Sequence, residues 1–95
     1  MSRAFVKEDA DAEGPKRFQL PAPGDAGYPL AAVRALLHGA DQGDSLSAEE
    51  ATGYRFGDPR LIQEARQLLA QAAERQDDRM MQLAERFLRK AGVRV

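Results

Sequence analysis

Apolar residues recur at helical spacing most clearly in the last third of the chain. Residues 59–75 and residues 78–91 each carry an apolar stripe along one side, spanning about 140–160° of a helical wheel. The stripes consist of Leu61, Ile62, Ala65, Leu68, Leu69, Ala72 and Ala73 in the first segment and Met80, Leu83, Ala84, Phe87, Leu88 and Ala91 in the second. Because only a short turn separates the segments, the pattern predicts an antiparallel helical hairpin.

Start and stop signals frame this hairpin. Asp58 can cap the first helix, and Pro59 suits its first turn because the missing N–H would be unpaired there. Either Asp77 or Asp78 can cap the second helix, and Gly92 follows its end.

Two shorter helices are expected before the hairpin. One begins near Pro29 and ends at Gly39, which can adopt the left-handed conformation typical of helix ends. Its apolar stripe is Leu30, Val33, Leu36 and Leu37. The other begins with a capping box formed by Ser47 and Glu50 and stops at Gly53.

Residues 1–27 are expected to form a flexible or extended tail, and residues 28–95 a small helical domain. Gly14-Pro15 and residues 21–24 disfavour regular structure, and residues 1–15 are predicted to move on the nanosecond timescale. Two apolar patches, Phe5-Val6 and residues 18–20, can dock either on the domain or on a partner. The predicted fold class is therefore all-α.

Composition narrows the function classes. The 95 residues fit one domain, and the absence of cysteine excludes disulfides and thiolate metal sites. No apolar run approaches the roughly 18 residues of a membrane span, and the N-terminus lacks the apolar core of a signal peptide. A cytoplasmic protein without membrane contact is expected. The net charge of −1 provides no global field for nucleic-acid binding.

No catalytic constellation is predicted. His38, the only histidine, falls in the last turn of its helix, where it complements the helix dipole. The pairs Glu49-Glu50 and Asp77-Asp78 cannot converge on one pocket, because adjacent helical residues point about 100° apart. We therefore expect no enzyme activity, no cofactor and no metal site.

Candidate partner-binding residues lie in two places. Arg79, Arg86, Arg89 and Lys90 share one face of the last helix, which either solubilises the surface or binds an acidic protein or a phosphate backbone. Tyr54 and Phe56 lie between two helices, where they either pack over the junction or anchor a partner.

The opening Ser2-Arg3-Ala4-Phe5-Val6-Lys7-Glu8 resembles the leader of some bacterial proteins of the Gre transcription-elongation-factor family. The stretch from Gly43 to Tyr54 resembles the acidic tip of the Gre hairpin: Asp44 matches the tip aspartate, and Glu49 or Glu50 the second acid. The chain departs from that family in its short preceding helix, in an extra residue between Asp44 and Leu46, and in lacking the family's C-terminal globular domain. The resemblance implies proximity to RNA polymerase rather than retained transcript cleavage.

Together these observations predict a small non-catalytic interaction or adaptor protein associated with RNA polymerase or transcription. The alternative is a nucleic-acid-binding protein that uses the basic face of the last helix. Because a domain of this size has a thin core, a homodimer is also considered, formed through the edge near Ala73 and Met81. The competing explanation is that the first helix or residues 18–20 cover this edge.

Overall fold

The computed structural model describes residues 18–94, and this part of the chain is helical and contains no strand. Its elements are helix α2 (Tyr28–Asp41), helix α3 (Ser45–Thr52), the 3-10 turn η2 (Pro59–Leu61), helix α4 (Ile62–Glu74) and helix α5 (Asp78–Lys90). The all-α prediction is confirmed. The expectations for residues 1–15 and for Phe5-Val6 lie outside the described residues.

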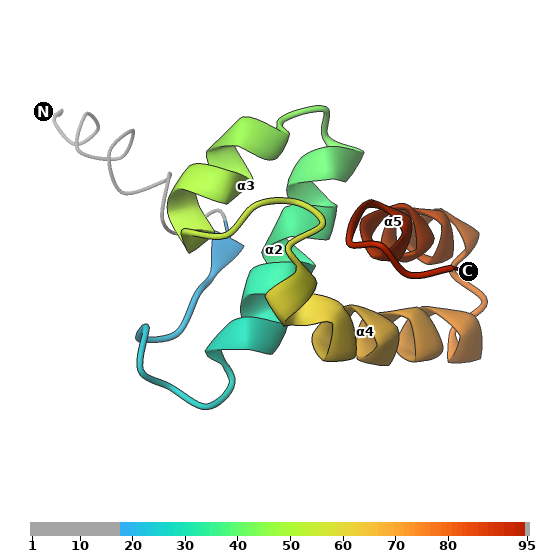
Figure 1. The fold of residues 1–95 in the computed structure, drawn as a ribbon, viewed down its shortest axis with the longest axis horizontal. Coiled ribbons are helices and arrows are strands. Elements are labelled where there is room, and N and C mark those ends of the chain that lie inside the picture. Colours follow the sequence, from blue (N-terminus) through green and yellow to red (C-terminus); the bar gives the residue numbers. More distant parts are fainter. Residues whose placement is uncertain (1–17, 95) are drawn as a thin grey trace, which may run out of the picture.

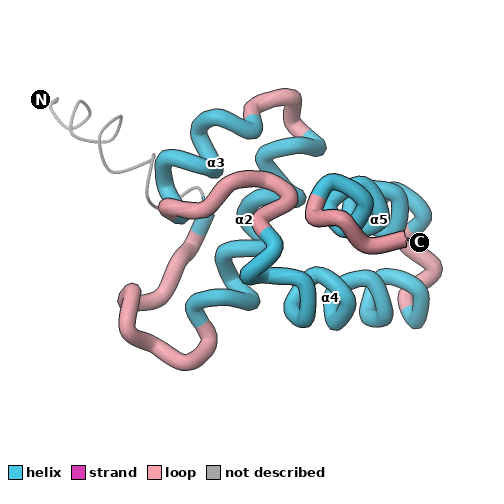
Figure 2. The backbone as a smooth tube through the Cα atoms, in the orientation of Figure 1, coloured by secondary structure: helices cyan, strands magenta, loops and turns pink. Residues whose placement is uncertain are grey.

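Helix α2 occupies the centre of the arrangement. It packs against α3 on one side and against α4 and α5 on the other (Figure 1). Helices α4 and α5 run side by side and form the predicted antiparallel hairpin, with the short loop between them visible in Figure 2. The core lies where these helices meet, and its largest fully buried side chains are Val33, Leu36, Leu61, Leu83, Phe87 and Leu88.

The caps of the hairpin follow the sequence signals, with one difference. The Asp58 carboxylate accepts a hydrogen bond from the Arg60 N–H at 2.9 Å, but the turn that begins at Pro59 is a 3-10 turn, and α4 starts at Ile62. Short 3-10 turns are common where α-helices begin. At the second helix Asp77, rather than Asp78, is the cap and accepts from the Met80 N–H at 3.2 Å.

The prediction that Gly39 ends the first helix is wrong. Helix α2 continues to Asp41, and Gly39 is buried inside it. A Cβ atom at position 39 would lie 2.6 Å from the Ala48 Cβ and 3.0 Å from the Asp44 carbonyl oxygen. Glycine is therefore present because α2 and α3 approach closely at this point, not because the helix ends there.

The capping box predicted at Ser47 is also wrong. Helix α3 begins at Ser45, and Asp44 is its cap, since the Asp44 Oδ1 atom accepts a hydrogen bond from the Ser47 N–H at 3.3 Å. The end of this helix is as predicted: Gly53 has a φ of +80°, in the left-handed region. Asp44, three positions before Ser47, is also a residue type that caps helices, and in the structure α3 begins directly after it.

Residues 18–20 dock on the domain rather than extending away from it. Phe18 is buried in the core cluster with residues of α2 and α3, and Leu20 packs against that cluster. Residues 21–27 then turn through hydrogen bonds such as that from the Gly27 N–H to Asp25 Oδ1 at 2.7 Å. The packed unit therefore begins before residue 28. At the edge considered for a homodimer, Ala73 is exposed and Met81 is partly buried; dimerisation there stays a prediction.

Within residues 18–94, none of the helices has the length and apolar character that crossing a bilayer requires.

Candidate functional site

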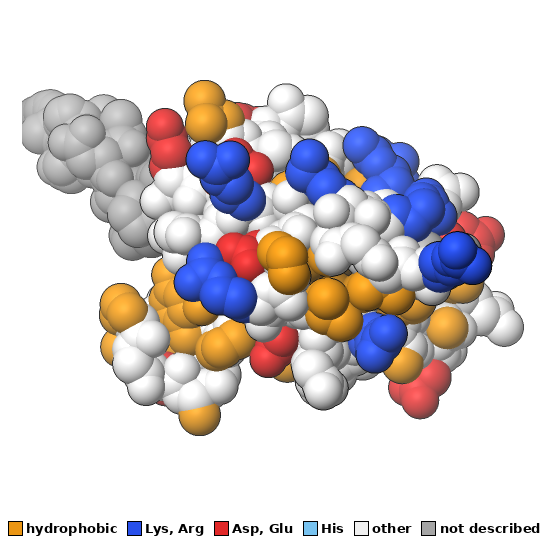
Figure 3. Space-filling view, in the orientation of Figure 1, with side chains coloured by type: hydrophobic (Ala, Val, Ile, Leu, Met, Phe, Trp, Pro, Cys, Tyr) orange, Lys and Arg blue, Asp and Glu red, His pale blue; other side chains and the backbone are white. Residues whose placement is uncertain are grey.

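A hollow of about 450 Å³ lies between α3 and the C-terminal half of α5, and we call it the basic hollow. Its lining residues are Ala40, Ser45, Glu49, Phe56, Arg86, Arg89 and Lys90. Residues about 40 positions apart in the sequence thus share one surface. Figure 3 shows Lys and Arg side chains gathered over the α5 side of this face.

The three cations project into solvent because α5 is strongly two-sided. Its buried face consists of Leu83, Ala84, Phe87 and Leu88. Arg86, Arg89 and Lys90 fall on the exposed face, spaced one helical turn or less apart. Their position in the last turns of α5 is favourable because the C-terminal end of a helix carries partial negative charge. None of the three forms an ion pair with a residue that the structure describes.

Lys90 is held against the loop that precedes α4. A Cβ atom at Gly57 would lie 2.6 Å from the Lys90 Cγ and 2.7 Å from its Cβ, so the lysine stem crosses this glycine in close contact. Gly57 has a φ of +87°, in the region that favours glycine. The loop therefore fixes the lysine stem and leaves the ammonium group at its exposed end.

Glu49 places one negative charge in the basic hollow. Its Oε2 atom accepts a hydrogen bond from the Phe56 N–H at 3.0 Å, which ties α3 to the following loop. Phe56 itself is buried, and its ring packs edge-on against Phe87 with the centroids 5.0 Å apart. Of the two alternatives for Phe56, the structure shows packing over the helix junction, and an exposed anchor at this position is wrong.

Tyr54 lies outside the basic hollow and is half-buried. Its ring is 6.5 Å from that of Tyr28, and the guanidinium carbon of Arg60 lies 4.9 Å from the Tyr54 centroid. Arg60 is in turn paired with Asp58 through two hydrogen bonds of 3.1 and 2.7 Å. The hydrogen bonds from Arg60 hold the pKa of Asp58 below its usual range, against the opposing effect of burial.

Arg79 is separated from the other three cations. Its Nε atom donates to Asp41 Oδ1 at 2.8 Å, which links α5 to the end of α2. The basic face predicted on the last helix is therefore divided: Arg79 belongs to an ion pair, and the other three residues border the hollow.

The acidic residues of the segment from Gly43 to Tyr54 are placed at different points of a short helix. Asp44 caps α3, Glu49 borders the basic hollow, and Glu50 is exposed. The segment packs against α2 through Ala48 and Thr52.

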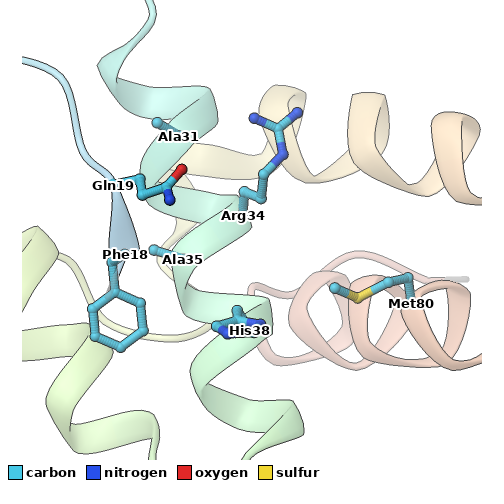
Figure 4. A pocket seen from close by; sticks show the side chains of 7 residues that line it. All are labelled: Phe18, Gln19, Ala31, Arg34, Ala35, His38 and Met80. Atoms are coloured by element: carbon cyan, nitrogen blue, oxygen red, sulfur yellow. The ribbon is translucent and has the colours of Figure 1, made fainter. Parts of the chain in front are cut away.

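A second hollow, also of about 450 Å³, lies over α2 and was missed by sequence reasoning. Phe18 and Gln19 form one side, Met80 the other, and α2 the floor (Figure 4). His38 belongs to this lining, in the last turn of α2 as predicted. The helical spacing of Ala31, Arg34, Ala35 and His38 was the available signal. Among residues 18–94, no three His, Asp or Glu side chains are placed to hold a metal ion.

Comparisons with known proteins found no matching family model and no significant similarity to a curated protein or a solved structure.

Proposed function

We propose that this chain is a non-catalytic interaction protein whose basic hollow binds an acidic segment of a protein partner. One observation carries the proposal: Arg86, Arg89 and Lys90 border a single hollow, and none is neutralised by an ion pair within residues 18–94. Carboxylates on a partner would supply the missing counter-charges. Exposed charges of this kind mainly set specificity and association rate.

Two features favour a protein segment over a nucleic acid. Glu49 adds a carboxylate to the hollow that repels phosphates and carboxylates alike, but it also accepts hydrogen bonds from the backbone amides of a peptide. The neighbouring aromatic rings are also engaged: Phe56 is buried, and Tyr54 lies between Tyr28 and Arg60. Single-stranded nucleic acids usually need exposed rings on which bases stack.

We further propose a subunit of bacterial RNA polymerase as the partner. The support is the resemblance of the residues from Ser2 to Glu8, and of those from Gly43 to Tyr54, to Gre-type elongation factors. The second segment supplies Ser45 and Glu49 to the basic hollow.

A fluorescein-labelled hexaglutamate peptide tests the charge preference directly. We expect Arg86→Gln, Arg89→Gln and Lys90→Gln each to weaken binding about threefold, because each removes one charge contact of up to about 1 kcal/mol. Arg66→Gln is the matched control, since Arg66 is exposed on α4 and does not line the hollow. Equal affinities for all four variants would contradict the site.

Two further measurements separate the alternatives. Tighter binding of a 12-nucleotide oligothymidine than of hexaglutamate, with the same three residues responsible, would favour the nucleic-acid function instead. Binding to purified bacterial RNA polymerase that hexaglutamate competes away would support the named partner. Peptide binding without polymerase binding would retain the site and exclude that partner.

A further inference from the structure

The hollow over α2 has the size of a small-molecule site and is independent of the basic hollow. Its volume of about 450 Å³ lies within the range of roughly 300–1,000 Å³ that is typical of ligand pockets. Ala31 and Ala35 form its floor, Phe18 forms one wall, and Met80 forms the other (Figure 4). Because both floor residues are alanine, a flat group can approach the helix closely.

The walls favour an aromatic ligand. Phe18 is buried except for the part of its surface that lines the hollow, and the partly exposed His38 lies edge-on to it with the centroids 6.4 Å apart, so a third ring can extend this aromatic pair beside His38. Across the hollow the thioether of Met80 can contact a ring favourably, and methionine adapts to the shape of its neighbour. An aliphatic ligand would gain only the apolar contact.

The polar side chains of the lining favour a negative charge on the ligand. They are Gln19, Arg34 and His38, and no carboxylate is among the lining residues that the structure describes. Arg34 is exposed, has no hydrogen bond or ion pair with residues 18–94, and extends from α2 toward α4 (Figure 4). It also lines a smaller adjoining hollow of about 170 Å³. A guanidinium at the rim suits a carboxylate or sulfonate.

We propose that this hollow binds a small aromatic anion, an aryl carboxylate or aryl sulfonate. The ring lies on Ala31 and Ala35 between Phe18 and Met80, and the acid group meets Arg34. This orientation places the apolar body against buried surface and leaves the charged group at the solvent edge. The inference does not depend on the proposed function, since no residue lines both hollows.

Titration with 8-anilinonaphthalene-1-sulfonate, an aryl sulfonate that fluoresces on entering apolar sites, tests this assignment. We expect one probe per chain for the folded protein. Arg34→Gln should weaken binding about tenfold, because it removes a charge-assisted contact. Ala31→Leu should abolish binding by filling the floor, and Arg66→Gln should leave it unchanged.

Decanoate serves as the matched control ligand, since it carries one negative charge but no ring. We expect it to bind at least tenfold more weakly than the aryl sulfonate. Equal affinities would overturn the aromatic assignment, and aryl sulfonate binding that is unchanged in both Arg34→Gln and Ala31→Leu would overturn the site. If either variant unfolds, amide chemical shifts of the wild-type protein decide: changes centred on Phe18, Ala35 and Met80 support the site, and changes elsewhere exclude it.

Discussion

The Glu49 Oε2 atom accepts a hydrogen bond from the backbone N–H of Phe56 at 3.0 Å. This contact joins α3 to the loop that leads toward α4, and it lies beside three cations of α5. One carboxylate therefore has two physical roles: it satisfies a backbone donor, and it lowers the positive charge of the basic hollow.

Substitutions at Glu49 should separate these two roles. Glu49→Gln keeps a side-chain acceptor but removes the charge, so we expect hexaglutamate to bind about twofold to fivefold more tightly with little change in stability. Glu49→Ala also leaves the Phe56 N–H without its partner, and should lower the free energy of unfolding by about 0.5–1.5 kcal/mol. Fluorescence anisotropy and urea denaturation measure these effects. Glu50→Gln is the control, and an equal gain in affinity there would contradict a specific role for Glu49.

The hairpin should depend unequally on its two stripes. Phe87 is fully buried and contacts Phe56, so Phe87→Ala should cost about 3–5 kcal/mol of unfolding free energy. Leu69 is only partly buried, and Leu69→Ala should cost less than half of that. Urea denaturation followed by circular dichroism gives both values. A loss under about 0.5 kcal/mol at Phe87 would show that this ring does not contribute to the core.

Gly57 and Gly53 form a matched pair for testing how Lys90 is positioned. Both have positive φ, at +87° and +80°, so alanine at either site should cost about 1–2 kcal/mol of stability. Of these two glycines, Gly57 contacts the Lys90 stem, whereas a Cβ atom at Gly53 would have no atom of residues 18–94 within 4 Å apart from its chain neighbours. We therefore expect Gly57→Ala to cost more stability and to weaken hexaglutamate binding, and Gly53→Ala to leave affinity unchanged. Equal effects of both variants on affinity would argue against this positioning of Lys90.

The pair formed by Asp58 and Arg60 predicts a pH dependence of stability. The pKa of Asp58 is lowered in the folded state by the hydrogen bonds from Arg60, so the folded protein favours the ionised carboxylate. The stabilisation is fully present above the unfolded pKa of about 4 and is lost as the pH falls through the lower folded pKa. Since Arg60 is largely exposed, screening by solvent should keep this contribution small.

Asp58→Asn, which retains a capping oxygen, checks this sign. Its stability deficit relative to wild type should be largest near pH 7 and should shrink below about pH 4. Arg60→Gln should show the same trend, because it removes the other member of the pair. A deficit that grows on acidification would contradict the assignment.

Local signals in the sequence were sufficient for the helical elements and most of their ends. Apolar spacing on α4 and α5 predicts the buried stripes, and their short connection predicts the hairpin. Asp58, Asp77 and Gly53 act on backbone groups within three or four residues, so their effects can be predicted without knowing the fold.

Only the tertiary structure decided which helical faces meet. The local preferences of glycine would also suit a helix end at Gly39. In the structure, however, α2 continues through Gly39, and the close approach of Ala48 leaves no room for a side chain there. Likewise, periodicity puts Arg86, Arg89 and Lys90 on one face of α5 but does not bring Glu49 beside them. Helical spacing determines the side of a helix on which a residue lies. Contacts between residues distant in the chain also depend on how the helices pack against one another. In this protein, helix packing places Ala48 against Gly39 and brings Glu49 beside the three cations of the basic hollow.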